Sequence, residues 1–270
     1  MSGRQVADRA IGIFDSGVGG LTVYREIARQ LVGEEYLYLG DTGRVPYGTK
    51  SPSTVLRYAQ EAAAFLVSHR VKMIVVACNT ASAVALADLE ERFRLPVIGV
   101  IEPGARKAVA VTRNRRVGVI GTEGTIKSGA YTRAIHAHDA QIEVVSAACP
   151  LFVPLVEEGW AEHQVTRLIA QEYLAPLLRH DIDTLVLGCT HYPLLKPTLR
   201  ALLGEKVTLV DSAAETAKSV REVLHRDNLL RQSLPAPPRF FVTDLPTRFE
   251  QVGGSFLGDL LSNVQQVEIG

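Results

Sequence analysis

The sequence predicts an α/β protein of two pseudo-symmetric, doubly wound domains with mainly parallel sheets. Short runs rich in Val, Ile and Leu alternate with longer amphipathic segments, which is typical of parallel strands that helices cover on both faces. Four runs of the first half also have counterparts about 110 residues later, in the same order. This repeat indicates two related halves, although ordinary α/β periodicity without a duplication is an alternative explanation.

The strands are expected where the apolar runs lie. The run MIVVA before Cys78 and the run TLVLG before Cys189 have the continuous apolar character of buried parallel strands. In chain order, we expect strands at 11–15, 35–40, 73–77, 96–101, 116–121, 141–146, 183–188 and 206–211.

Amphipathic segments between these runs are expected to form the covering helices. Pro52 follows Ser51, and proline in the first turn after a capping serine is typical of a helix start. The proline-rich stretch 233–238 predicts a linker, followed by a late strand at 240–243 and a short helix at 255–262. In chain order, we expect the other helices at 20–31, 51–69, 80–93, 103–112, 128–138, 163–179, 192–203 and 213–226.

Composition and charge exclude several classes of protein. The chain has 270 residues, 47% of them hydrophobic, and a formal net charge of zero. The charges are interspersed, so no basic stripe indicates a nucleic-acid partner, and the apolar runs are too short to span a membrane. The polar N-terminal segment lacks the apolar core of a secretory signal, and three widely spaced cysteines make neither a disulfide framework nor a zinc site. We therefore expect a cytoplasmic protein that holds no metal.

Two cysteines at matching places in the repeat are the leading candidates for chemistry. Cys78 and Cys189 each follow a predicted strand, at the sheet edge where α/β proteins bind ligands. Two thiols there could approach one small substrate from opposite sides, which suits moving a proton from one face of a carbon to the other. A following helix N-terminus is expected to lower each thiol pKa. Buried structural cysteines are the alternative, and we expect Cys149 to be one.

Polar loops at the same sheet edge supply further candidates. The glycine-rich loop that begins Asp15-Ser16 suits a small carboxylate better than a dinucleotide, although Asp15 could be a plain N-cap. His191 lies two residues after Cys189, where it could assist proton transfer or hold substrate. The Tyr47-Gly48 loop is a candidate substrate clamp. Thr122 and Thr125 offer hydroxyls to a carboxylate, whereas Glu157 could simply end a solvated helix.

The motifs FDSGVGGLTV, DTGRVPYG, ACNTAS, GTEGTIKSGAY, FVPLVEEG and LGCTHYPLL resemble successive motifs of the glutamate racemase family, over about residues 11 to 220. The resemblance implies cofactor-independent interconversion of L- and D-glutamate by two bases. Cys78 would take the α-proton of D-glutamate while Cys189 protonates the opposite face, with reversed roles for L-glutamate. It also implies that Asp15 and His191 assist Cys78 and Cys189, with Asp41 and Glu157 as possible auxiliary acids. The implied substrate-binding set is Asp15, Ser16, Tyr47, Gly48, Asn79, Thr80, Thr125, Thr190 and His191.

The same resemblance implies an organisation and a cellular role. One domain would comprise residues 1–100 plus 211–270 and the other residues 101–210, with glutamate in the cleft between them. D-glutamate would supply peptidoglycan synthesis and so cell-wall biogenesis and cell shape in the bacterial cytoplasm, and the enzyme would be a homodimer. A racemase of aspartate or hydantoins, a single-thiol amidase using Cys189 and His191, and a binding protein without catalysis remain alternatives.

Overall fold

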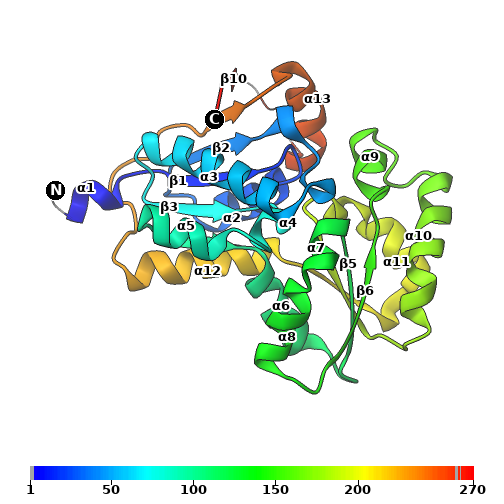
Figure 1. The fold of residues 1–270 in the computed structure, drawn as a ribbon. Helices are drawn as coiled ribbons and strands as arrows, with labels where there is room; N and C mark the ends of the chain where they lie inside the picture. Colours follow the sequence, from blue (N-terminus) through cyan, green and yellow to red (C-terminus); the bar gives the residue numbers. More distant parts are fainter. Residues whose placement is uncertain (1–2, 259–260, 262) are drawn as a thin grey trace.

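The computed structural model describes residues 3–258, 261 and 263–270, and these residues form two sheets whose strands are all parallel. The larger sheet has the order β10-β9-β2-β1-β3-β4 (Figure 1). Its strands are β1 (Ile11–Asp15), β2 (Tyr36–Gly40), β3 (Met73–Val76), β4 (Val97–Gly99), β9 (Arg239–Val242) and β10 (Val264–Gln266). The fold class predicted from the sequence is confirmed.

The smaller sheet repeats the central order of the larger one. Its order is β6-β5-β7-β8, which corresponds strand for strand to β2-β1-β3-β4. The strands are β5 (Arg116–Gly121), β6 (Glu143–Ala148), β7 (Thr184–Gly188) and β8 (Thr208–Asp211). The four segments that match along the sequence are therefore the four strands that match in space, and β3 corresponds to β7.

Helices cover both faces of the larger sheet because successive strand residues point to opposite sides. Ile11 and Ile13 pack with α2 (Leu21–Gln30) in one apolar cluster, whereas Phe14 packs on the other face with α3 (Pro52–Ser68). The helices α12 (Ala213–Arg226) and α13 (Pro246–Leu257) lie beside α2, and α5 (Leu86–Phe93) lies beside α3. The short α1 (Gly3–Ala7) precedes the sheet.

The smaller sheet is covered in the same way. One face carries α6 (Ile101–Val111) and α8 (Ala130–His138), and the other carries α9 (Phe152–Glu157), α10 (Gln164–Leu178) and α11 (Lys196–Leu203) (Figure 1). The short α7 (Glu123–Ser128) lies between the two sheets and packs near α4 (Asn79–Ser82). Among the described residues, no helix is long and apolar enough to cross a membrane.

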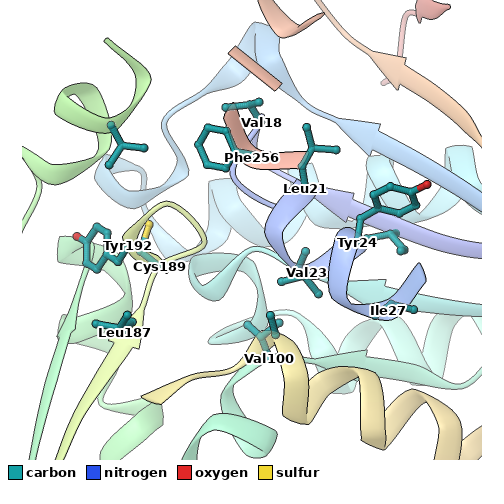
Figure 2. Close-up of a cluster of buried hydrophobic side chains, with 14 of the residues drawn as sticks. Val18, Leu21, Val23, Tyr24, Ile27, Val100, Leu187, Cys189, Tyr192 and Phe256 are labelled. Atoms are coloured by element: carbon teal, nitrogen blue, oxygen red, sulfur yellow. The ribbon is translucent and has the colours of Figure 1, made fainter. Parts of the chain in front are cut away.

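Apolar side chains also fill the space between the two sheets. One buried cluster contains Val18 and Leu21 from the larger sheet's side and Leu187 and Cys189 from the smaller sheet's side. Figure 2 shows Phe256 of α13 beside Val18 and Leu21, with Cys189 and Tyr192 of the same cluster lower and to the left. The two halves therefore share one core next to the loops that follow β3 and β7.

The structure differs from the expected elements mainly near that junction and in the tail. The segment 80–93 is two helices, α4 and α5, instead of one. The helix expected at 255–262 is wrong, because α13 runs from Pro246 to Leu257; residues 259, 260 and 262 of that expectation lie outside the described residues. The elements α1, α7, α9 and β10 were not expected.

Candidate active site

Both candidate thiols line one pocket between the two sheets. Cys78 follows β3 and Cys189 follows β7, and their residues are only 5% and 6% exposed. Since β3 and β7 are equivalent strands, the repeat itself brings the two sulfur atoms to one place. The pocket is lined by Ser16, Val45, Pro46, Tyr47, Gly48, Cys78, Asn79, Thr80, Thr122, Val153, Cys189, Thr190 and His191.

The environment of Cys78 favours the neutral thiol. Cys78 is the residue before the first turn of α4, and its Sγ lies 3.7 Å from Ser16 Oγ. Burial, assisted by the negative charge of Asp15, raises the pKa of Cys78 to about 12. A hydrogen bond from the backbone of Ala81 acts in the opposite direction but is outweighed. The expectation of a lowered pKa is therefore wrong for Cys78, because desolvation exceeds the effect of a one-turn helix.

Asp15 lies behind Cys78 instead of forming part of the pocket wall. Its residue is fully buried, and its Oδ2 accepts a hydrogen bond of 3.0 Å from the backbone N–H of Gly17. The glycine-rich loop thus surrounds the chain's own carboxylate, while Ser16 faces the pocket. The other oxygen, Oδ1, is buried without a hydrogen-bond partner among the described residues. Burial raises the pKa of Asp15 despite the opposing charge of His191. Asp15 is not an N-cap, since that position of α2 is Gly20.

Cys189 has a cationic neighbour instead. The Nδ1 atom of His191 lies 3.9 Å from Cys189 Sγ, and its Nε2 lies 2.8 Å from Glu157 Oε1. Burial alone would lower the pKa of His191, but hydrogen bonds with Cys189 and Glu157 outweigh it and raise the pKa to about 10. His191 is therefore an imidazolium at neutral pH, placed to stabilise a thiolate at Cys189.

Glu157 belongs to this site and is not merely a solvated helix end. It is the last residue of α9 and is held close to His191 by the packing of Phe152 and Val156 in the core. Burial raises the pKa of Glu157, but the hydrogen bond with His191, together with the positive charges of His191 and Arg248, outweighs burial and lowers the pKa. Because 34 residues separate Glu157 from His191, only the tertiary fold pairs them.

Three threonine hydroxyls join the two halves on another side of the pocket. Thr80 Oγ1 lies 2.9 Å from Thr122 Oγ1 and 3.2 Å from Thr125 Oγ1, and the last two are 3.0 Å apart. Thr80 and Thr122 line the pocket, whereas Thr125 is buried behind them. Each hydroxyl can donate or accept, so the group can turn a donor toward a carboxylate.

The Tyr47-Gly48 loop closes the pocket from the larger sheet's side. A Cβ on Gly48 would lie 2.6 Å from Thr122 Cβ, so the loop packs directly against the other half. The Tyr47 hydroxyl donates to Asp41 Oδ2 at 2.5 Å. Asp41 is fully buried and also accepts hydrogen bonds from Arg44 and Thr243. Asp41 therefore lies outside the pocket lining, where it holds the loop.

The glycine-rich loop presses on the residues around Cys189. A Cβ on Gly19 would overlap both His191 and Thr190, and Thr22 Oγ1 donates to the Thr190 carbonyl at 3.0 Å. The loop after β1 thus fixes the loop after β7 from across the junction. Cys149, in contrast, is fully buried, lies outside the pocket and packs in the core.

The pocket contains most of the site residues expected from the sequence. Asp15, Asp41, Thr125 and Glu157 lie behind its wall, each bonded to or next to a wall residue. Sequence reasoning missed Val153, which has no polar signal, and Tyr131, whose hydroxyl bonds Asn79. Among the described residues, no three His, Cys, Asp or Glu side chains cluster so as to hold a metal ion.

Comparison with known proteins identifies relatives of the whole chain. The model of the Asp/Glu/hydantoin racemase family matches residues 11–220. A glutamate racemase of Geobacter metallireducens is 58% identical over 262 residues, which is 97% of each chain. A crystal structure of a glutamate racemase isoform from Bacillus anthracis has a TM-score of 0.92 at 45% identity, covering 96% of this chain and 97% of that one. A glutamate racemase from Francisella tularensis, solved with D-glutamate, has a TM-score of 0.91 at 39% identity, with 97% and 98% covered. The chain is therefore a member of the Asp/Glu/hydantoin racemase family of enzymes.

Proposed function

We propose that this enzyme interconverts L- and D-glutamate without a cofactor, using Cys78 and Cys189 as its two acid-base groups. The observation that carries the proposal is the meeting of two thiols, from equivalent strand ends, in a single small pocket. Glutamate as the substrate is supported by the relatives, which are 48% to 58% identical over nearly the whole chain and are named glutamate racemases.

The different surroundings of the thiols suit a two-base reaction. One base must begin as a thiolate and the other as a thiol, so that one takes the α-proton while the other gives a proton to the opposite face. Imidazolium His191 favours thiolate at Cys189, and buried Asp15 favours the thiol at Cys78. In this state the enzyme accepts L-glutamate: Cys189 removes its α-proton and Cys78 releases a proton to the opposite face of the carbon.

Each conversion exchanges the protonation states of the two thiols. After conversion of L- to D-glutamate, Cys189 is a thiol and Cys78 is a thiolate. This form is ready for D-glutamate, from which Cys78 takes the α-proton as Cys189 supplies one. Asp15, next to Cys78, and His191, next to Cys189, are suited to assist each thiol in turn.

The carbanion that forms between the two steps needs stabilisation. The α-proton of an amino acid is far less acidic than a thiol, so its loss requires fixed hydrogen-bond donors around the carboxylate and a pocket without bulk water. Asn79, Thr80 and Thr190 provide neutral hydrogen-bond donors that do not protonate the thiolate. Ser16 and the Tyr47-Gly48 backbone also line the pocket, where they can hold the second carboxylate.

The wider role follows from the product. We propose that D-glutamate serves peptidoglycan synthesis in the bacterial cytoplasm and that the enzyme acts as a homodimer. We also propose that residues 1–100 plus 211–270 form one domain and residues 101–210 the other. Closure of these domains over the substrate would exclude water from the pocket.

The first experiment is α-proton exchange during racemisation of L-glutamate in deuterated water, without added cofactor. Circular dichroism follows the loss of optical activity, and NMR follows deuterium at the α-carbon, for the wild type, Cys78→Ser and Cys189→Ser. We expect each substitution to lower racemisation at least about 100-fold. Cys149→Ser is the matched control, since that buried thiol lies outside the pocket, and it should retain activity.

Other outcomes separate the alternatives. A wild type that is inert on L-glutamate but racemises aspartate or a hydantoin would contradict the substrate. Cys189, His191 and Glu157 are also arranged in the order of a thiol, base and acid, as in a single-thiol hydrolase. Hydrolysis of a glutamate amide with a covalent thioester at Cys189, unchanged in Cys78→Ser, would favour that activity instead.

A further inference from the structure

Tyr131 is a buried residue that touches the loops of both thiols without lining the pocket. It is the second residue of α8 and only 3% exposed. A Cβ on Gly188 would lie 3.0 Å from Tyr131 Cε2, and one on Gly104 would lie 3.3 Å from Cε1. The ring therefore fits a slot left by two glycines, one of which directly precedes Cys189.

The Tyr131 hydroxyl reaches across to the other thiol's loop. It donates a hydrogen bond of 2.7 Å to Oδ1 of Asn79, the residue that follows Cys78 and begins α4. Tyr131 comes from the half that carries the smaller sheet, and Asn79 follows a strand of the larger sheet. One side chain thus contacts the residue before Cys189 and the residue after Cys78.

The chemistry of the amide gives this hydrogen bond its direction. The Tyr131 hydroxyl faces the amide oxygen of Asn79, which can only accept, so the phenolic hydrogen is donated to Oδ1. The Asn79 amide therefore presents its oxygen to Tyr131.

This arrangement leaves the amide nitrogen of Asn79 for the pocket. Asn79 lines the pocket beside both thiols, and its Nδ2 has no hydrogen-bond partner among the described residues. An amide group donates from one end and accepts at the other, so a flipped Asn79 would turn an oxygen toward an anionic substrate. That orientation would repel a carboxylate, whereas the observed one attracts it.

We propose that Tyr131 is a positioning residue for racemisation, which fixes the Asn79 amide so that Nδ2 donates to a carboxylate of the substrate. The inference rests on the proposed function, because it requires an anionic substrate between the two thiols. Tyr131 touches no reacting atom and acts only through Asn79. The hydroxyl is the essential group, and the ring fills the slot between the glycines.

The test is a double-mutant cycle of Tyr131→Phe and Asn79→Ala, measured by circular dichroism with L- and D-glutamate. Tyr131→Phe keeps the ring and should lower kcat/KM about tenfold, the effect of losing one well-placed donor to a charged group. Both enantiomers should lose the same factor, because they have equal free energies in water and their kcat/KM values must stay equal. In the Asn79→Ala background, removing the hydroxyl should change kcat/KM less than about twofold.

Tyr36→Phe is the matched control. The Tyr36 hydroxyl is also buried, but it donates to the backbone carbonyl of Leu31 at 2.6 Å, away from the pocket. Its loss should leave kcat/KM unchanged. A tenfold effect of Tyr131→Phe that persists without Asn79 would overturn the inference, as would an active wild type unaffected by the substitution. A wild type inert on glutamate would instead contradict the proposed function and the inference together.

Discussion

The side chains next to each thiol give the two thiols different electrostatic surroundings. Cys78 and Cys189 are almost equally buried, so solvent access does not distinguish them. The difference lies in their neighbours, since Asp15 disfavours a second negative charge at Cys78 and imidazolium His191 favours one at Cys189. Two equivalent positions of a repeated fold have thus acquired opposite electrostatic surroundings.

We expect iodoacetamide to modify Cys189 at least about tenfold faster than Cys78 at pH 7, because the thiolate is the reactive species and the raised pKa of Cys78 keeps that residue a thiol. His191 is protonated below its raised pKa of about 10, so the advantage of Cys189 should shrink as the pH rises toward that value. Mass spectrometry of tryptic peptides over time gives both rates, with buried Cys149 as an internal reference. Glu157→Gln should reduce the difference between the modification rates of Cys189 and Cys78, because it lowers the pKa of His191. Equal rates in the wild type would contradict the raised pKa of Cys78.

Local sequence predicts some of these site residues and cannot predict others. Cys78 and Cys189 could be recognised because each directly follows an apolar run, and the carboxyl ends of parallel strands meet at one sheet edge. The pairing of Glu157 with His191 depends instead on how α9 packs. The raised pKa of Cys78 depends on burial by both halves, which no local pattern contains.

At the scale of elements, the loop after β1 (Ile11–Asp15) packs closely between the two halves. Gly19 must lack a side chain because His191 and Thr190 occupy the place of a Cβ. The same loop encloses the Asp15 carboxylate and supplies Ser16 to the pocket. Its glycines therefore serve close packing across the junction, in addition to the turn between β1 and α2.

Gly19→Ala should reduce racemisation at least about 100-fold while the protein remains folded, because the new methyl group displaces His191 from Cys189. Gly33→Ala is the matched control, since a Cβ there meets nothing within 4 Å. Racemisation and thermal unfolding are measured for both variants. Full activity of Gly19→Ala would show that the loop can move without disturbing the site.

Element prediction failed where tertiary packing overrides local preference. The helix α13 begins at Pro246, and proline is typical of the first position of a helix. Gly253 and Gly254 in its interior have low helix propensity, so the local sequence does not indicate a helix there. A Cβ on Gly253 would lie 3.0 Å from Leu261 Cδ2 and 3.1 Å from Leu21 Cδ1, so close packing with α2 requires the glycine. The strands β1 to β9 and most of the longer helices were predictable because their apolar periodicity and their packing agree.

At the scale of the whole molecule, one buried lysine ties distant segments to the larger sheet. Lys72 is 1% exposed and forms an ion pair with Glu34. Its Nζ also donates to the carbonyls of Ala7, at 2.7 Å, and Leu229, at 2.8 Å. The N-terminal helix and the segment after α12 are thereby held at one point.

Lys72→Met should lower the free energy of unfolding by roughly 3 kcal/mol, because it leaves the Glu34 carboxylate buried without its cation and two carbonyls without their Lys72 donor. Urea unfolding followed by circular dichroism measures the change. Lys218→Met is the control, since the Lys218 side chain is 52% exposed and its ion pair with Glu215 lies at the surface. A change below about 0.5 kcal/mol in Lys72→Met would show that the segments are held by other contacts.

The strand order of the larger sheet has a consequence for synthesis of the chain on the ribosome. Every strand of the smaller sheet has been made by residue 211, but β9, which covers the edge of β2, begins only at Arg239. A nascent chain interrupted between these points carries a complete smaller sheet and a larger sheet with the buried, apolar β2 open at its edge. Such an edge readily pairs with strands of other chains. A premature stop codon in this interval should therefore yield an aggregating fragment and not a weakly active enzyme.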